Sequence, residues 1–467
     1  MLFSSHIFIF VFLPIAFMGY HLINKFHFTI ASKVWLIFAS LFFYAWWNIS
    51  YLPLIILSMI VNYKFSTSMM KIEKVSLKKL LLYLSLLFNL GLLSYFKYMD
   101  FFIENLNLTF DSDVSLLHLA LPLGISFYTL QQITYAVDSY KGLIKKENFL
   151  DYAIFVTFFP QLIAGPIVHH KEMMPQFYAI KNKVLNLHNI AAGFFIFSIG
   201  LFKKIMIADY FAVIATKGFD YSEILTFAAA WTTSLAYTFQ LYFDFSGYTD
   251  MAIGLALLFN IKLPINFNSP YKATNIQDFW RRWHMTLSRF LKDYVYIPLG
   301  GNRQGSFRTY NNLFATFLLA GIWHGAGWTF VFWGLLHGGS LIIHRFWSNL
   351  GLTMPRVLGW FITFNFINLA WVFFRAREWD DALKVLKGMS GLADENILSI
   401  LTSLQGLNIK TTLALFAGFV VVLMFKNSMQ QLEVFKFNYK TICFTSMLFV
   451  VSVLSMDKIT EFIYFNF

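Results

Sequence analysis

The sequence contains few charged residues and a single cysteine. Asp, Glu, Lys and Arg make up 13% of its 467 residues, whereas hydrophobic residues make up 58% and aromatic residues 20%. A soluble globular domain carries about 25% charged residues, so the composition excludes that class and indicates a membrane protein. Cys443 is the one cysteine, which excludes an internal disulfide and a cysteine-based metal site.

Long stretches without Asp, Glu, Lys or Arg recur along the whole chain. A helix needs about 20 apolar residues to cross the hydrocarbon core of a bilayer, so such stretches are candidate spans. They cover residues 1–24, 34–63, 81–96, 114–137, 152–170, 184–202, 224–243, 309–344, 357–374, 411–425 and 441–456. The first stretch lacks the features of a signal peptide, so we expect it to be retained. The sequence predicts an all-α polytopic membrane protein with about 11 transmembrane helices.

The net charge of +12 is spread between the apolar stretches. Topology and anionic headgroups explain basic residues in such places, so we expect membrane lipids and no nucleic acid as partners. Short basic loops stay in the cytoplasm, and the lysines between 64 and 79 and between 426 and 440 therefore belong inside. Both termini are then expected to be extracytoplasmic.

Proline and glycine interrupt the apolar stretches at "LPLGISFY" (121–128), "FFPQLIAGPI" (158–167) and "DFSGYTD" (244–250). Irregular backbone at membrane depth is stable only where protein buries it or where it lines a wet cavity. We therefore expect re-entrant or interfacial helices around a shaped interior. Because no internal repeat of the transporter kind is visible, we expect one integral membrane domain over residues 1–467.

The segment 277–303, "QDFWRRWHMTLSRFLKDYVYIPLGGNR", combines basic and aromatic residues. Arg281, His284, Ser288 and Lys292 are spaced by three, four and four residues, which predicts one face of an amphipathic helix. Its positive charge favours the cytoplasmic interface. Lipid headgroups and an anionic substrate explain the arginines about equally well.

Two histidines, His284 and His324, stand out. His324 lies in "GIWHGAGW" (321–328), within a long uncharged stretch where a titratable ring is costly to bury. A lone membrane histidine is often a hydrogen-bonded packing residue, but the pair suits proton transfer within a membrane. Neither histidine lies in a metal-binding pattern, so we expect no metal.

The order of these motifs resembles the membrane-bound O-acyltransferase family. The resemblance is carried by "GISFYTLQQITYAVDSY", "FFPQLIAGPI", "YFDFSGYTDMAIGL", "FWRRWHMTLSRFLKDYVYIPLGGNR" and "LLAGIWHGAGWTFVFWGLLHG". It is strongest over residues 120–345. Within the family the chain is most similar to the bacterial branch of peptidoglycan and alginate O-acetylation proteins and the teichoic acid D-alanyl transfer protein.

The resemblance implies a ring of helices around a central tunnel, in the cytoplasmic (inner) membrane of a bacterium. It implies acetyl-CoA as the acyl donor, with His324 as the essential histidine and general base and His284 as the second polar residue of the site. Arg281, Arg282 and Lys292 become candidates for binding the phosphates of the donor, although headgroup contact explains them too.

The last residues, "EFIYFNF", form an F-x-Y-x-x-F pattern that resembles the tail of a small partner peptide in teichoic acid D-alanylation. The resemblance implies that the tail, residues 457–467, presents Tyr464 as a covalent acyl relay. The alternative is an interfacial anchor, because tyrosine is common at membrane boundaries.

The resemblance also implies a periplasmic or cell-surface partner, a serine O-acetyltransferase or esterase-like protein, because no extramembrane stretch is long enough for a catalytic domain of its own. Peptidoglycan is the favoured acceptor. Alginate or another exopolysaccharide, and D-alanyl transfer to teichoic acid, stay open. A transporter of lipid-linked sugars and a non-catalytic scaffold are more distant alternatives.

Overall fold

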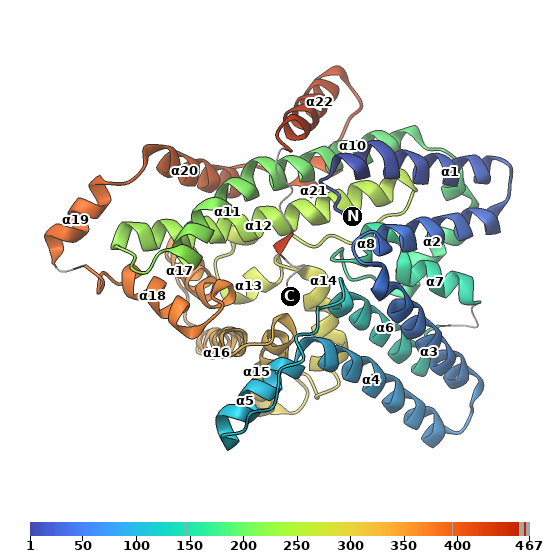
Figure 1. Ribbon diagram of the computed structural model, residues 1–467, viewed down its shortest axis with the longest axis horizontal. Coiled ribbons are helices and arrows are strands. Elements are labelled where there is room, and N and C mark those ends of the chain that lie inside the picture. Colours follow the sequence, from blue (N-terminus) through green and yellow to red (C-terminus); the bar gives the residue numbers. More distant parts are fainter. Residues whose placement is uncertain (145–147, 395, 457–461, 464–467) are drawn as a thin grey trace. The chain divides into compact units, whose positions relative to one another are not determined.

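The computed structural model describes residues 1–144, 148–394, 396–456 and 462–463. Within these ranges the chain forms helices and no β-strand (Figure 1), which confirms the all-α class. The chain divides into two compact units. Unit 1 comprises Met1–Phe202, Gly247–Pro264 and Phe435–Phe467, and unit 2 comprises Lys203–Ser246 and Ile265–Val434. A single domain over the whole chain stays a prediction.

Unit 1 contains the N-terminal helices and the last one. They are α1 (Leu13–Lys25), α2 (Thr29–Ala45), α3 (Leu52–Lys71), α4 (Val75–Lys97), α5 (Met99–Phe110), α6 (Ile125–Tyr140), α7 (Phe149–Thr157), α8 (Phe159–Leu162), α9 (His170–Tyr178), α10 (Leu187–Phe202) and α22 (Tyr439–Leu454). The long helix α12 (Phe227–Leu258) contributes residues to both units.

Unit 2 contains the remaining α-helices. They are α11 (Asp209–Thr216), α13 (Ile276–Trp280), α14 (Met285–Leu291), α15 (Gly305–His324), α16 (Trp328–Asn349), α17 (Arg356–Arg375), α18 (Trp379–Met389), α19 (Ile397–Gln405), α20 (Ile409–Met424) and α21 (Ser428–Glu433). Short π-helical turns lie at Lys203–Ala208, Lys217–Tyr221 and Lys292–Tyr296.

The chain is a multi-pass membrane protein, but the predicted count of about 11 spans is not confirmed. Among the described residues, five helical segments are long and apolar enough to cross a membrane, or six if the bent pair α19 and α20 forms one span. The five are Phe8–Lys25, Ile49–Lys71, Val75–Lys97, Leu187–Tyr221 and Arg356–Arg375.

Turns inside uncharged stretches explain much of the difference. The stretch 34–63 contains the end of α2 and the start of α3, where Pro53 occupies the first turn. The stretch 309–344 folds as two helices, α15 and α16, that pack against each other. A count of uncharged residues detects neither turn, because the turn residues are themselves uncharged.

The three predicted interruptions have different outcomes. The backbone is irregular before α6, where Gly124 has a φ of 71°, and again around the single-turn helix α8. In contrast, "DFSGYTD" (244–250) lies inside the continuous helix α12, so the predicted break there is wrong. Gly247 serves close packing instead, since a Cβ on Gly200 of α10 would lie 2.5 Å from the Gly247 carbonyl oxygen.

Buried side-chain amides join α3, α4 and α6 in unit 1, which lie side by side (Figure 1). Asn62 and Asn89 exchange hydrogen bonds of 3.1 and 2.6 Å, and Asn62 also donates to Gln132. Ser58 and Ser85 donate to Gln132 and Asn62, respectively. Hydrogen bonds of this kind stabilise helix association in a bilayer, where lipid competes for apolar contacts.

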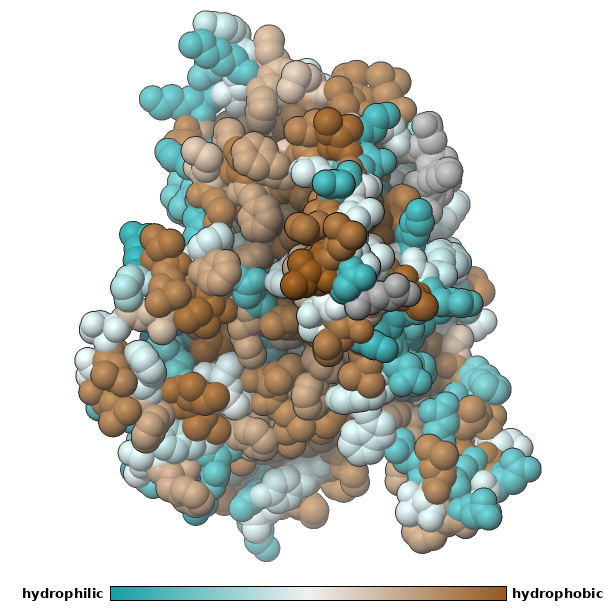
Figure 2. Space-filling model, turned by 90° about the vertical axis from the view of Figure 1, so that its left-hand side faces the viewer, coloured by the Kyte–Doolittle hydropathy of each residue, from teal (hydrophilic) through white to brown (hydrophobic). Residues whose placement is uncertain are grey.

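The outer faces of the helices are apolar. Ile30 and Phe38 of α2 and Leu87 of α4 are each more than 60% exposed, and hydrophobic side chains cover much of the face in view in Figure 2. A soluble protein avoids such exposure. These surfaces therefore suit contact with lipid chains.

Gly254→Leu tests the close approach of α10 and α12 in unit 1. A Cβ at Gly254 would lie 2.5 Å from the Gly193 carbonyl oxygen, so a leucine must push the helices apart, at a cost of about 1–3 kcal/mol. We expect a lower midpoint of thermal unfolding for the purified protein in detergent. Gly91→Leu is the control, because a Cβ there meets no atom within 4 Å. Equal midpoints for the two variants would contradict this packing.

Candidate functional site

His324 lies at the apex of a helical hairpin in unit 2. It is the last residue of α15, and the chain turns through residues 325–327 into α16. Glycines bring the two backbones together, because a Cβ on Gly321 would lie 2.5 Å from the Phe330 carbonyl oxygen and one on Gly334 would lie 2.7 Å from that of Phe317. The glycines of the motif therefore hold the histidine against the returning helix.

Aromatic rings surround the His324 imidazole, which is only 4% exposed. The ring of Trp333 from α16 lies 5.2 Å away and that of Phe374 from α17 lies 5.1 Å away, both edge to face. Trp323 packs at 4.9 Å. Apolar surroundings of this kind disfavour a charged imidazolium. His324 is therefore enclosed by aromatic side chains from α15, α16 and α17.

His284 does not lie on one continuous helix with Arg281 and Lys292, and that prediction is wrong. Helix α13 ends at Trp280, and α14 begins only after His284, whose φ of 44° is left-handed. This conformation costs a residue other than glycine about 1–2 kcal/mol. Residues spaced by three and four positions share a face only within one helix, and here the helix is interrupted between α13 and α14.

Asn266 fixes the orientation of His284. Its side-chain oxygen accepts from the Thr286 backbone N–H at 3.2 Å and from the Thr286 hydroxyl at 2.9 Å, and it lies 3.1 Å from His284 Nδ1. His284 Nδ1 must therefore be the donor, which leaves the lone pair of the neutral ring on Nε2. Complete burial lowers the pKa of His284 to about 3, so its imidazole is neutral at physiological pH.

Three stacked or tilted tryptophans connect the two histidines. Trp283, next to His284, lies 5.0 Å from Trp371 of α17, which lies 5.9 Å from Trp333 beside His324. We call these three residues the tryptophan row. The structure thus brings both sequence-predicted histidines to one buried aromatic cluster, which the sequence alone did not establish.

His337 of α16 belongs to the same cluster, although it was not among the candidate site residues named from the sequence. It is fully buried, and Trp280 Nε1 donates to its Nδ1 at 3.2 Å. Trp333 lies one helical turn before it, with the two rings 4.5 Å apart. The spacing of Trp333 and His337 by four residues was the signal that would have placed them on one face.

The three predicted phosphate-binding residues differ in their surroundings. Arg282 pairs with Asp278 at 2.9 Å and also donates to the Asn268 carbonyl oxygen. Arg281 and Lys292 are exposed, and neither forms an ion pair with another described residue. Their charges are therefore available to an anion, whereas that of Arg282 is largely neutralised.

A buried ion-pair triad was missed by the sequence interpretation. Lys204 lies 2.7 Å from Asp244 and 2.9 Å from Asp209, and the Lys204 and Asp244 side chains are 6% and 1% exposed. Charges within a membrane segment are costly unless paired and are commonly functional. The signal was available, since Asp244 begins "DFSGYTD" and Lys204 follows an apolar stretch.

Tyr464 lies outside the described residues. Its neighbour Phe462 is buried in unit 1, where its ring stacks on Tyr248 at 4.5 Å, and Tyr248 in turn stacks on Phe3 at 4.9 Å. Within the part of the chain that the structure describes, no three His, Cys, Asp or Glu side chains form a group that could hold a metal ion.

Comparison with known proteins gives a consistent family match. The model of the membrane-bound O-acyltransferase family matches residues 43–377. The chain is 56% identical to a peptidoglycan O-acetyltransferase of Helicobacter pylori, over 84% of this chain and 80% of the relative.

Two further groups of relatives match. The chain is 41% identical to a probable alginate O-acetylase of Pseudomonas aeruginosa, over 83% of this chain and 75% of the relative. It is 29% identical to a teichoic acid D-alanyltransferase of Bacillus subtilis, over 55% of this chain and 69% of the relative.

Lys204→Met tests the buried triad. The substitution leaves Asp244 as a buried carboxylate without its cation, and losing one partner of a buried pair costs about 3–5 kcal/mol. We expect a markedly lower thermal midpoint in detergent, partly restored by adding Asp244→Asn. Lys292→Met, at an exposed lysine, is the control. A Lys204→Met protein as stable as the parent would show that the pair contributes nothing.

Proposed function

The chain belongs to the membrane-bound O-acyltransferase family and is an acyltransferase, and from this premise we propose that it is a membrane O-acetyltransferase serving peptidoglycan. It takes an acetyl group from acetyl-CoA on the cytoplasmic side and passes it to an extracytoplasmic partner that acetylates the glycan. The observation that carries the proposal is the 56% identity to a peptidoglycan O-acetyltransferase over most of both chains.

His324 is the general base in this proposal. Its neutral imidazole accepts the proton of the acceptor hydroxyl while the oxygen attacks the thioester carbonyl. A carbon–oxygen bond forms, the carbon–sulfur bond breaks, and the His324 imidazolium returns the proton to the thiolate, so that coenzyme A leaves as the free thiol. The rings of Trp333 and Phe374 support this role, because an imidazole in apolar surroundings stays neutral.

His284 positions the second polar contact of the site. Its Nδ1–H donates to Asn266, so its Nε2 carries the lone pair and can accept a hydrogen bond, and burial keeps the ring neutral. Arg281 and Lys292 bind the phosphates of the donor through charge-assisted hydrogen bonds, with Arg282 in a lesser role because Asp278 already pairs with it.

Tyr464 is the acyl relay of the tail, residues 457–467, in this proposal. Its phenolic oxygen receives the acetyl group and then gives it to the partner. The F-x-Y-x-x-F pattern supports the role, as does the burial of Phe462. The partner is a periplasmic or cell-surface serine O-acetyltransferase or esterase-like protein, and both termini of this chain lie outside the cytoplasmic membrane.

Alginate or another exopolysaccharide is the second candidate acceptor, favoured by the 41% identity to a probable alginate O-acetylase. D-alanyl transfer is less favoured, because the match to a teichoic acid D-alanyltransferase covers 55% of this chain. A carrier-bound D-alanyl thioester used in preference to acetyl-CoA would identify that chemistry.

His324→Gln tests the function as a whole. With acetyl-CoA and the purified full chain in liposomes, we expect release of coenzyme A thiol to fall by about 10²-fold or more, and His284→Ala to cause a smaller loss. His188→Gln, an exposed histidine of unit 1, should retain the parent rate.

His324→Gln and, to a smaller extent, His284→Ala should also lower the amount of ester-linked acetate in isolated peptidoglycan when the chain is expressed in a strain lacking its own enzyme, whereas His188→Gln should leave it unchanged. Unchanged acetylation by His324→Gln would support a scaffold, and no thiol release by the parent protein would support a transporter. Acetate found on a secreted polysaccharide but not on peptidoglycan would move the acceptor to the second candidate.

Tyr464→Phe tests the relay. After incubation with acetyl-CoA, peptide mass spectrometry should find an acetyl group on Tyr464 in the parent chain and none in the His324→Gln variant. Tyr464→Phe should release thiol no faster than the hydrolysis background. Full transfer to the partner by Tyr464→Phe would make Tyr464 an interfacial anchor.

A further inference from the structure

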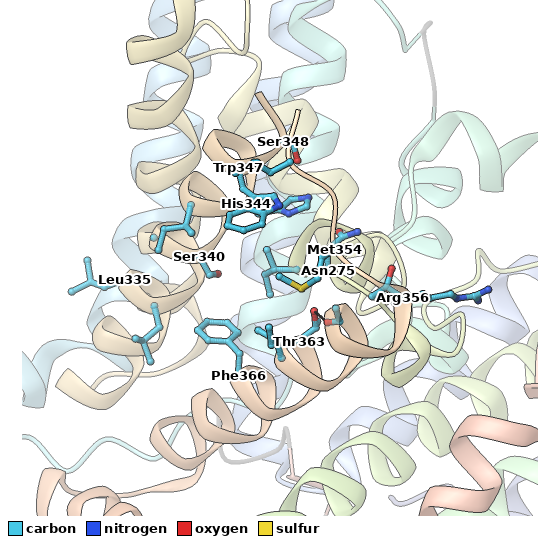
Figure 3. Close-up of a pocket in the computed structure, with 18 residues that line it drawn as sticks. Asn275, Leu335, Ser340, His344, Trp347, Ser348, Met354, Arg356, Thr363 and Phe366 are labelled. Atoms are coloured by element: carbon cyan, nitrogen blue, oxygen red, sulfur yellow. Dashed lines mark hydrogen bonds between the residues drawn. The ribbon is translucent and has the colours of Figure 1, made fainter. Parts of the chain in front are cut away.

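A groove of about 730 Å³ opens between α16 and α17 in unit 2 (Figure 3). Its size falls in the range of sites for small molecules and lipids. Leu335, Ile343, Ile362 and Phe366 supply apolar walls, and His344 and Arg356 are its ionisable residues. No Asp or Glu is among the described residues that line it.

The lining of the groove suits contact with a hydrocarbon chain. Two of the four hydroxyl groups that line it are satisfied by their own helices, since Ser340 donates to the His337 carbonyl oxygen at 2.9 Å and Thr363 to that of Gly359 at 2.7 Å. Neither hydroxyl therefore needs a polar ligand. Large apolar side chains remain exposed along the groove, with Ile343 68% and Ile362 48% exposed.

The depth of the groove matches one leaflet of a bilayer. Helix α17 is a candidate span with Arg356 at its first residue and Arg375 at its last, so Arg356 marks the level of the headgroups. Phe366 lies ten residues further along α17, about 15 Å deeper at 1.5 Å per residue. That distance is about half of the hydrocarbon thickness.

The end of the groove that lies away from Phe366 carries polar and aromatic residues (Figure 3). His344, Trp347 and Ser348 lie together at one end of the groove, and Arg356 projects from the rim away from the apolar floor (Figure 3). Trp347 is 40% exposed, as is common for tryptophan at a membrane boundary. Arg356 forms no ion pair with another described residue, so its charge is available to a phosphate.

We propose that this groove is a binding site for one anionic phospholipid. An acyl chain lies along the apolar walls, and the headgroup phosphate lies at the level of Arg356 and His344. Phe366 closes the inner end, with its ring 5.5 Å from that of His337. The bound chain thereby supports the wall between the groove and the aromatic cluster that contains His324.

Gly339→Phe is the steric test. Gly339 lines the groove, and a Cβ there meets no atom within 4 Å, so a phenylalanine side chain can enter the groove and obstruct it. Gly91→Phe on α4 is the matched control, because its Cβ also meets open space but lies in unit 1. After delipidation, each full chain is mixed with phosphatidylglycerol and studied by native mass spectrometry.

The result expected is one retained phosphatidylglycerol in the parent and in Gly91→Phe, and none in Gly339→Phe. Retention by a correctly folded Gly339→Phe protein would overturn the proposal, as would loss of the lipid on addition of acetyl-CoA, which would assign the groove to the donor. Lipid bound in a broad distribution, without one favoured molecule, would indicate ordinary boundary lipid and overturn it too.

Arg356→Gln tests the headgroup separately from the chain. We expect the parent to prefer phosphatidylglycerol over phosphatidylcholine of the same chain length by about fivefold, and Arg356→Gln to lose most of that preference. Arg308→Gln is the control, since Arg308 is also exposed in the first turn of a helix. Equal preference in the parent, or an unchanged preference in Arg356→Gln, would exclude an anionic headgroup site.

Discussion

The close backbone contact between α15 and α16 is the constraint on which the candidate site depends. Gly321 and Gly334 carry no side chain, so the two helices approach until backbone meets backbone. That approach fixes His324 at the apex and brings Trp333 within 5.2 Å of its ring. A larger residue at either glycine would separate the imidazole from the aromatic ring that keeps water away from it.

Both histidines are buried, but different surroundings hold them in place. Aromatic edges surround His324, whereas His284 is completely enclosed and has its tautomer set by Asn266. A neutral imidazole can accept a proton, and a ring fixed through Nδ1 presents Nε2 in one direction only. The left-handed backbone conformation of His284 is costly, and such conformations persist where the surrounding contacts hold a residue in place. The contacts of Asn266 with His284 and Thr286 do this here.

Local sequence patterns predicted the helical class of the protein but not the geometry of the candidate site. The helical class and the two histidines followed from composition and motif. The break at His284 did not, because Asn266, which stabilises it, comes from a different segment. Likewise, Gly247 indicated a break in α12 when taken alone, and its role in packing depends on Gly200 of another helix. Trp371 joins the row only through tertiary contacts.

The amide cluster of Asn62, Asn89 and Gln132 also bears on the order in which unit 1 assembles. Apolar helices in lipid can slide past one another with little change in energy, but an amide pair matches at one register only. During synthesis α3 and α4 are complete before α6, so Asn62 and Asn89 can pair first, and Asn62 then donates to the side-chain oxygen of Gln132 when α6 joins them. The register of the early hairpin is thus set before the segment that completes the three-helix core has been made.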